Sequence, residues 1–202
     1  MPEYELLYFP ARGRAEQIRL MFALEDRSFT ENPAANWPEL KPNTPFGRLP
    51  VLTERSDEGE FVLAESGAIM RHLGRLFGKY GRNARDHAMC DALADFIADE
   101  RAKYIPVAYA AVLKTTDEVI SAFWEHLPKT LGDLERMLAR NPNPDAGWFI
   151  TDTLTFADVG TFDYLDALEL LKPGCLADYP GLQGFVARFR ALPAIAPYLA
   201  KR

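Results

Sequence analysis

The sequence predicts two domains, a small α/β domain followed by an all-helical one. Up to about residue 80, short apolar runs alternate with segments of helical spacing, which is typical of mixed α/β structure. Beyond that point every signal is helical. Gly78-Lys79-Tyr80-Gly81 stands between the two parts, and its glycines suit a linker. We expect domains at residues 1–78 and 84–202, joined by a linker over 79–83.

The N-terminal half begins with a strand and a helix. Aromatic and aliphatic residues predict a strand over residues 4–8. Ile18, Met21 and Phe22 then recur at helical spacing, which predicts a helix over about residues 13–25. A helix with this pattern buries one apolar face and leaves the other to solvent.

A hairpin and a second helix complete this half. Short apolar runs at residues 51–53 and 61–63 predict two strands, and the Asp57-Glu58-Gly59 turn between them makes the pair antiparallel. A helix follows, marked by Ile69, Leu73, Leu76 and Phe77. It runs out at Gly78, because glycine favours the end of a helix. The local patterns therefore give strand–helix followed by strand–strand–helix.

The second half is predicted as a helical bundle. Apolar residues recur at helical spacing over residues 89–97 and again over 120–138. Thr155-Phe156-Ala157-Asp158 has the form of a capping box, and the apolar stretch after it predicts a buried central helix that starts at Phe156. Pro106 and Pro128 interrupt the helical patterns, so we expect a kink at each.

Composition and charge exclude several classes of protein. The chain has 202 residues, of which 48% are hydrophobic and 26% charged, as in ordinary globular proteins. Its formal net charge of −6 argues against nucleic acid as a partner. The longest uncharged apolar candidate, residues 104–113, is about half the length that a bilayer span needs. We therefore expect no membrane partner and a cytoplasmic location.

Metal sites and common hydrolytic motifs find no support in the pattern. Cys90 and Cys175 match neither a zinc set nor a CxxC pair, so we expect reduced, mostly buried thiols. His72, His87 and His126 are scattered along helices, where solvated or capping roles are expected, and neither HExxH nor GxSxG occurs. The acidic pairs at residues 57–58 and 99–100 could do acid-base work, and a turn and a helix face explain them equally well. We expect no metal.

One segment combines features that suit a reactive site. In Tyr8-Phe9-Pro10-Ala11-Arg12-Gly13-Arg14-Ala15-Glu16 a strand ends in a tyrosine and a basic loop opens the first helix. Together with residues 45–52 and 65–69, this segment resembles the signature of cytosolic glutathione transferases of the sigma, pi, mu and alpha group. The resemblance runs nearly end to end. Sigma-like and pi-like features both occur, so the class stays open.

The resemblance carries expectations about fold, co-substrate and assembly. It implies an N-terminal thioredoxin-like domain of order βαβαββα with a mixed four-stranded sheet, followed by the α-helical bundle. It implies glutathione as co-substrate and a homodimer as the assembly. Glutathione carries two carboxylates, one ammonium and a thiol, so its site needs cations, acids and backbone edges, and this chain supplies all three.

Tyr8 and Arg14 are the catalytic candidates that the resemblance implies. A thiol has a pKa of about 8.5, so little of it is thiolate at neutral pH. Lowering that pKa by about 2 units takes roughly 2.7 kcal/mol, within reach of a phenol hydrogen bond with helix-end and arginine electrostatics. Tyr8 would donate from a neutral hydroxyl, and Arg14 would add positive potential. A packed strand-end tyrosine and a surface charge are the alternatives.

The resemblance also implies a set of glutathione-binding residues. They are Tyr8, Arg14, Trp37, Lys41, Arg48, Leu49, Pro50, Glu65 and Ser66, with Asp99 reaching the site of a neighbouring subunit. Trp37, Lys41 and Arg48 offer an indole N–H and two cations to the glycine carboxylate. Loop positions and a solvated helix face would explain the same residues without a ligand.

Three further expectations concern the main chain and the helix start near this set. The Leu49–Pro50 bond would be cis and would turn the Leu49 backbone toward the cysteinyl unit. Ser66 would both cap the helix that it opens and bind the γ-glutamyl carboxylate. Glu65 departs from the glutamine usual in these classes, and its effect on affinity is left open.

The electrophile would meet the sulfur beside an apolar wall. Its candidates are Phe9, Ala11, Tyr104 and Tyr109, for which plain core packing is the alternative. The Tyr109 phenol could also act as an acid toward an epoxide or enone oxygen. Phe46 matches an aromatic key that some pi-class relatives insert into a partner pocket, and burial in its own subunit is an equal possibility.

Three functions remain after these arguments. The leading one is a glutathione transferase, an enzyme that conjugates glutathione to hydrophobic electrophiles. A glutathione-dependent isomerase of the prostaglandin D synthase type would use the same tyrosine. A non-catalytic ligand carrier or crystallin-like protein is the third, against which the presence of Tyr8, Arg14 and Ser66 argues.

Overall fold

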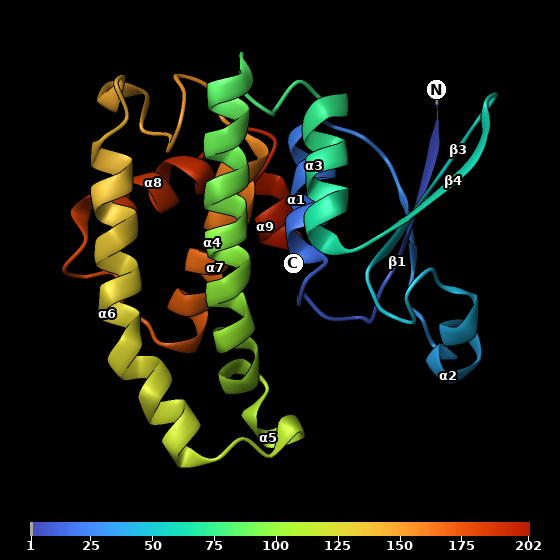
Figure 1. Cartoon of the computed structure of the whole chain (residues 1–202), viewed down its shortest axis with the longest axis horizontal. Coiled ribbons are helices and arrows are strands. Elements are labelled where there is room, and N and C mark those ends of the chain that lie inside the picture. The colour runs from blue at the N-terminus through green and yellow to red at the C-terminus, as the bar shows by residue number, and fades with distance from the viewer. Residues whose placement is uncertain (1) are drawn as a thin grey trace. The chain divides into compact units, whose positions relative to one another are not determined.

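A computed structural model describes residues 2–202 and divides them into two units, whose elements are labelled in Figure 1. The first unit contains the chain up to Gly78 together with residues 193–202, and the second is Lys79–Leu192. The sequence predicts residues 193–202 as part of the helical domain, whereas the structure groups them with the first unit. The predicted domain limits themselves stay a prediction.

The first unit is built on a mixed sheet. Four strands occur in the described residues, β1 (Glu3–Leu7), β2 (Thr30–Asn32), β3 (Val51–Ser56) and β4 (Gly59–Ala64), in the order β2-β1-β3-β4. β1 pairs with β2 in parallel, and the other two pairings are antiparallel. The predicted thioredoxin-like order and the hairpin are therefore confirmed. β2 carries no apolar residue, which is why the pattern of the sequence alone missed it.

Helices of this unit differ greatly in length. They are α1 (Glu16–Leu24), α2 (Trp37–Leu40), the 3-10 helix η1 (Lys41–Asn43), α3 (Ser66–Leu76) and α9 (Ala196–Lys201). Ile18, Met21 and Phe22 are fully buried on α1, as their spacing predicted. The Leu49–Pro50 peptide bond is cis, which confirms that expectation.

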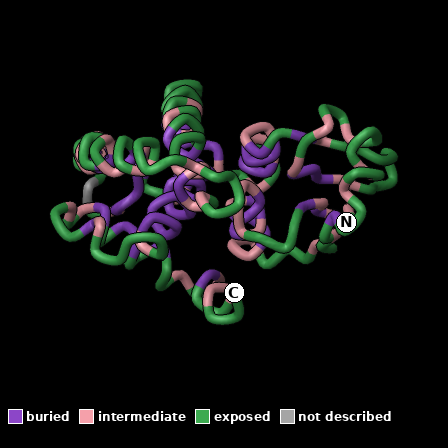
Figure 2. Tube along the Cα trace, turned by 90° about the horizontal axis from the view of Figure 1, so that it is seen from below, coloured by how far each residue is buried: buried purple, intermediate pink, exposed green. Residues whose placement is uncertain are grey.

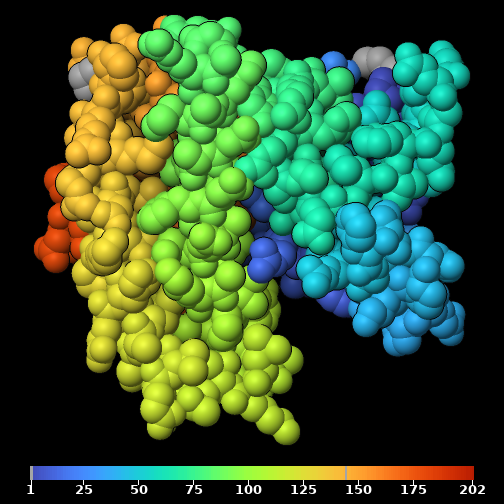
Figure 3. All heavy atoms as spheres, viewed as in Figure 1, coloured from blue at the N-terminus to red at the C-terminus, as the bar shows by residue number. Residues whose placement is uncertain are grey.

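The second unit is all-helical in the described residues. Its elements are α4 (Ala84–Ala108), α5 (Ala110–Leu113), α6 (Asp117–Ala139), the 3-10 helix η2 (Pro144–Ala146), α7 (Phe156–Leu171) and α8 (Pro180–Arg190). Figure 3 shows α4 and α6 lying against each other on one face of this unit. Pro106 lies within α4 and Pro128 within α6, and the predicted kinks stay a prediction.

α7 is the buried centre of the helical unit. Every residue from Phe156 to Leu168 is buried, and Figure 2 shows purple segments concentrated in the helical interior. The capping box predicted from the sequence is present, because the Thr155 side chain and the Asp158 side chain each bond the other's backbone. The predicted central helix and its start at Phe156 are confirmed. Among the described residues, no helix combines the length and apolar character needed to cross a membrane.

Candidate active site

Tyr8 lies directly after β1, where the strand gives way to the loop before α1. Its backbone N–H donates to the Asn32 carbonyl at 3.0 Å, a hydrogen bond that belongs to the parallel pairing of Leu7 with Asn32. The side chain is 9% exposed, and its hydroxyl oxygen accepts the backbone N–H of Arg14 at 2.9 Å. A phenol that accepts at its oxygen can still donate through its own O–H. The accepted amide dipole also favours negative charge at that oxygen, which strengthens the phenol as a donor.

Gly13 makes this contact possible. Its φ of +42° lies in the left-handed region, and a Cβ added to it would collide with the Tyr8 hydroxyl oxygen. Any side chain at this position would therefore push the phenol away from the Arg14 amide. In the sequence, Gly13 stands out only as part of the motif at residues 8–14. The signal for its role was its place between two arginines in the loop that opens a helix.

Arg14 contributes through its main chain in this structure. The expected supporting role rested on its guanidinium, whereas the contact with Tyr8 is made by its backbone N–H. Its carbonyl accepts the Gln17 side-chain amide at 3.4 Å, within the turn that opens α1. The side chain is half-buried. A role for its positive charge stays a prediction.

The sheet brings the predicted glutathione-binding segments to one end. Leu7 at the end of β1 is paired with Val51 at the start of β3, and Val51 is paired with Ala64 at the end of β4. Tyr8 follows the first of these residues, Leu49-Pro50 precedes the second, and Glu65-Ser66 follows the third. Three segments that are far apart in the sequence thus lie at the same end of the sheet. A tripeptide site needs several such segments.

Glu65 and Ser66 occupy the start of α3, with one correction to the expectation. The N-cap is Glu65, with φ +71°, and Ser66 is the first residue of the helix. Ser66 therefore does not cap α3, although its hydroxyl still lies at the helix start, where backbone N–H groups point outward. A non-glycine residue at such a φ costs about 1–3 kcal/mol and is concentrated at functional sites.

The candidates for binding the glycine carboxylate are one tryptophan and two cationic residues of the same unit. Trp37 opens α2 and Lys41 opens η1, and the Trp37 ring meets the edge of Phe9 with centroids 6.1 Å apart. Arg48 Nη1 lies 3.9 Å from Glu65 Oε1, and both side chains are largely exposed. The cation of Arg48 and the carboxylate of Glu65 are thus neighbours, so Glu65 partly offsets the positive charge offered to a carboxylate.

The remaining predicted residues are placed separately in the two units. In the first unit Phe9 and Ala11 are exposed. In the second unit the Tyr104 hydroxyl donates to the Ala167 carbonyl at 3.3 Å and its ring packs edge-on against Tyr164, while Tyr109 is exposed at the end of α4. Tyr104 therefore has the contacts of a core residue. The shared apolar wall stays a prediction.

Asp99 and Phe46 are the two candidates for contacts with a neighbouring subunit. Asp99 is exposed on α4, whereas its neighbour Glu100 is buried and accepts from Thr130 Oγ1 at 2.8 Å. The solvated-face interpretation of residues 99–100 is therefore wrong for Glu100. Phe46 is 66% exposed, so burial within its own subunit is wrong as well. The contact of Asp99 with a neighbouring subunit stays a prediction.

Both cysteines belong to the helical unit. Cys90 and Cys175 are free, and burial raises the pKa of each thiol to about 12, so neither is a nucleophile at neutral pH. Neither cysteine is in a disulfide, as predicted, and Cys90 is buried whereas Cys175 is half-buried. In the part of the chain that the structure describes, no group of three or more potential ligands gathers into a metal site.

Family models and curated relatives match this chain over almost its whole length. Residues 5–75 match the glutathione S-transferase N-terminal domain, and residues 98–202 match the C-terminal domain. Similar proteins include glutathione S-transferase P of Homo sapiens, 34% identical over 99% of this chain and 93% of the relative. Another is a glutathione S-transferase of Dirofilaria immitis, 35% identical over 98% of this chain and 93% of the relative.

Solved structures of the same kind share the fold. The Pi-class glutathione S-transferase of Onchocerca volvulus superposes with a TM-score of 0.86 and 31% identity, covering 99% of this chain and 93% of that one. The glutathione S-transferase of Ascaris lumbricoides gives a TM-score of 0.84 at 31% identity, with coverage of 99% and 97%.

Proposed function

Because the chain belongs to the glutathione S-transferase family, we propose that it binds glutathione beside Tyr8 and transfers the glutathione sulfur to hydrophobic electrophiles. The observation that carries this proposal is the Tyr8 hydroxyl, which accepts a hydrogen bond from the Arg14 backbone N–H at 2.9 Å. It lies at the end of the sheet where three loop segments come together. This polarised phenol donates a hydrogen bond to the bound sulfur. The protein is a transferase that uses glutathione as co-substrate.

The chemistry requires the sulfur to be an anion. Tyr8 keeps its proton and stabilises the thiolate through a charge-assisted hydrogen bond. The thiol proton passes to water. The sulfur then forms a bond to the electrophilic carbon, and the leaving group departs with the electron pair of the bond that breaks. A donor placed before the reaction stabilises the anion without reorganisation, which is the main source of electrostatic catalysis.

We assign the rest of the tripeptide to the loop segments at the same end of the sheet. The Leu49 backbone pairs with the cysteinyl unit, and the start of α3 at Ser66 receives the γ-glutamyl carboxylate. Trp37, Lys41 and Arg48 hold the glycine carboxylate, and Glu65 pairs with the γ-glutamyl ammonium. The exposure of Lys41, Arg48 and Glu65 supports their part of the assignment, since a ligand needs access to them.

Assembly and location belong to the same proposal. The protein forms a homodimer in the cytoplasm, in which Asp99 completes the ammonium site of the partner. Exposed Phe46 and exposed Asp99 support an interface that covers both. In the first unit, exposed Phe9 and Ala11 are the candidates to contact the electrophile, and in the second unit exposed Tyr109 is the candidate acid for substrates that need one. Tyr109→Phe should slow epoxide opening and spare aromatic substitution, and equal losses in both reactions would remove that role.

A direct test measures sulfur ionisation and transfer together. The ultraviolet absorbance of the thiolate is followed against pH for glutathione with and without the protein, and conjugation is followed with chlorodinitrobenzene. We expect a bound thiol pKa about 2 units below that of free glutathione, and a conjugation rate above the uncatalysed one. An unchanged thiol pKa with no rate increase would reject the transferase and favour a carrier.

Gly13→Ala tests whether the absence of a side chain at residue 13 is needed for the contact between Tyr8 and Arg14. The added methyl group collides with the Tyr8 oxygen, so the Tyr8–Arg14 contact is lost and conjugation falls by about ten- to a hundredfold. Gly78→Ala is the matched control, because Gly78 also has a positive φ of +66° but an added Cβ would meet no atom within 4 Å. Both variants lose stability through backbone strain. Equal conjugation rates in the two would contradict the role of Gly13.

A further inference from the structure

A buried carboxylate lies in the first turn of α1, two residues after Arg14. Glu16 is 1% exposed and has charged and polar partners from both ends of the first unit. Arg19 Nη1 lies 3.4 Å from Glu16 Oε2, and Arg12 Nε lies 3.9 Å from Oε1. The Glu16 carboxylate thus neutralises guanidinium groups of the catalytic loop and of α1.

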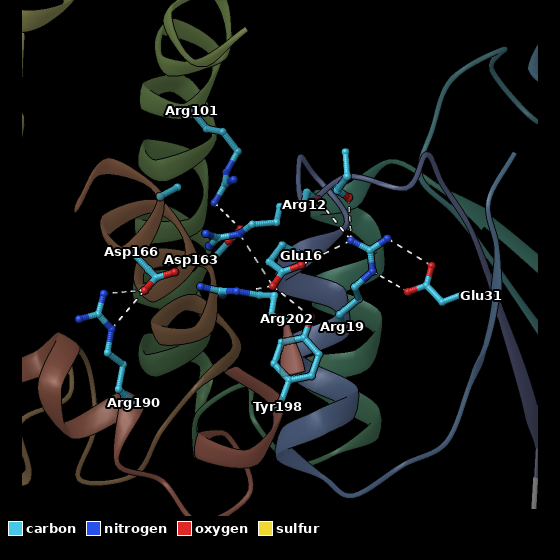
Figure 4. Close-up of polar contacts among 12 residues, drawn as sticks. Arg12, Glu16, Arg19, Glu31, Arg101, Asp163, Asp166, Arg190, Tyr198 and Arg202 are labelled. Carbon is cyan, nitrogen blue, oxygen red and sulfur yellow. Dashed lines mark hydrogen bonds and ion pairs between the residues drawn. The ribbon is translucent and has the colours of Figure 1, made fainter. Parts of the chain in front are cut away.

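Two of its partners come from the C-terminal helix. The Tyr198 hydroxyl on α9 donates to Glu16 Oε1 at 3.0 Å, and Arg202 Nη1 lies 3.3 Å from the same oxygen. Figure 4 shows Tyr198, Arg202 and Arg19 converging on Glu16. Burial and the adjacent Glu16 carboxylate raise the pKa of Tyr198, so its hydroxyl stays protonated and remains a donor. The end of the chain is therefore anchored at the start of α1.

Arg19 connects this anchor to the backbone of the catalytic loop. Its Nη1 donates to the Ala11 carbonyl at 2.8 Å and to the Arg12 carbonyl at 3.5 Å. Its other nitrogens bond the Glu31 carboxylate at 2.5 and 3.2 Å. The guanidinium also lies 5.9 Å from the centroid of the Tyr8 ring. One side chain thus contacts Glu16, two loop carbonyls and the face of Tyr8.

The loop between these carbonyls and Tyr8 is short. Gly13 and Arg14 follow Arg12 directly, and the Arg14 N–H is the group that the Tyr8 hydroxyl accepts. A change in the direction of the Ala11 and Arg12 carbonyls would therefore move the Arg14 amide. The geometry of the hydrogen bond between Tyr8 and Arg14 therefore depends on the direction of these loop carbonyls, which Arg19 helps to fix.

We propose that α9 positions the Tyr8–Arg14 contact through Glu16 and Arg19, so that Tyr198 and Arg202 at the end of the chain tune the ionisation of the bound sulfur. This inference rests on the proposed function, because it concerns the donor strength of the same phenol. Tyr198 and Arg202 are positioning residues, since they act through Glu16. When they are removed, Glu16 is left with fewer partners and draws more strongly on Arg12 and Arg19, which shifts the loop carbonyls.

The test compares Tyr198→Phe, Arg202→Gln and the double variant with wild type. Lys201→Gln is the matched control, because Lys201 is also a basic residue at the end of α9, where it is exposed. Arg202→Lys keeps the charge and should restore part of any loss. Two readouts are taken on each protein: amide hydrogen exchange at Arg14 without glutathione, and the pKa of the bound glutathione thiol.

In the double variant we expect the Arg14 amide to exchange about tenfold faster. The thiol pKa should rise by about half a unit, and kcat at neutral pH should fall about threefold with KM for glutathione unchanged, because no binding group is removed. Lys201→Gln should match wild type in every readout. Amides of the central sheet, such as those of Leu6 and Leu52, should exchange at wild-type rates and serve as internal references.

Three results would overturn the coupling. They are an Arg14 amide with wild-type exchange in the double variant, equal acceleration at the sheet amides, and the same changes in Lys201→Gln. The second would assign α9 a purely structural role. Failure of the proposed function is a separate outcome: a wild-type protein that leaves the thiol pKa unchanged would reject sulfur activation, while exchange at Arg14 would still decide whether α9 holds the loop.

Discussion

Replacement of Tyr8 by phenylalanine is expected to raise the pKa of the bound glutathione thiol by about 1 to 2 units, and kcat/KM at neutral pH should fall by about ten- to a hundredfold. The variant loses the hydroxyl that donates to the sulfur and leaves the backbone N–H of Arg14 without this acceptor. A hydrogen bond to a charged group contributes about 1.5–3 kcal/mol, which sets the size of the effect. The ring of Tyr8 and its packing are preserved.

The pH dependence gives the sign of this effect. Because the thiolate is the reactive form, a higher thiol pKa moves the pH–rate profile toward alkaline pH. The loss in Tyr8→Phe should therefore be largest below the wild-type thiol pKa and should shrink at high pH, where the sulfur is ionised in both proteins. Conjugation with chlorodinitrobenzene across pH, together with the thiolate absorbance, measures the shift.

Tyr179→Phe is the control for the loss of a phenol. The Tyr179 hydroxyl also contacts the main chain, donating to the Pro128 carbonyl at 3.1 Å, but it lies in the helical unit. Its loss should leave the thiol pKa unchanged. A Tyr8→Phe protein that keeps the wild-type profile would show that another group stabilises the sulfur.

Asp158→Ala should give the largest loss of stability, about 3–5 kcal/mol in the free energy of unfolding. Asp158 is fully buried at the start of α7. Its carboxylate accepts the Phe149 N–H at 2.8 Å, and the Thr155 N–H at 2.8 Å and hydroxyl at 2.6 Å. Burial raises the pKa of Asp158, and the hydrogen bonds from Thr155 and Phe149 oppose that rise.

Alanine at this position removes all three acceptor contacts and leaves buried donors without a partner. Thermal unfolding should shift down by roughly 10 °C for a protein of this size. Asp178→Ala is the control, because Asp178 is exposed and its substitution removes a carboxylate without a buried network. A midpoint within the error of wild type for Asp158→Ala would show that the capping box contributes little to the helical unit.

Local patterns predicted the elements whose stability depends on nearby residues. The β3–β4 hairpin follows from two apolar runs and a turn, and α7 follows from a capping box before an apolar stretch. β2 and α2 were missed by these patterns and were expected only from the family resemblance. Three polar residues, Thr30–Asn32, form a strand because β1 offers them parallel pairing, and no side-chain periodicity records that.

The candidate site divides in the same way. The motif at residues 8–14 placed a tyrosine at a strand end before a helix, and the structure adds that the Tyr8 oxygen faces the Arg14 amide and needs Gly13 to have no side chain. The expected cap at Ser66 was wrong by one residue, because Glu65, with a positive φ directly after β4, is the N-cap and Ser66 is the first helical residue. Spacing in a sequence cannot distinguish these two positions.

The hairpin, the central helix and the family resemblance could be read from the amino-acid sequence, because apolar periodicity, turn residues and motifs act over a few positions. The environment of Glu16 could not be read from the sequence. Its partners Tyr198 and Arg202 lie 182 and 186 residues away along the chain, and a charged residue in the first turn of a helix is ordinarily exposed. Only the folded chain brings those groups together, since burial of a carboxylate depends on which distant donors the packing supplies.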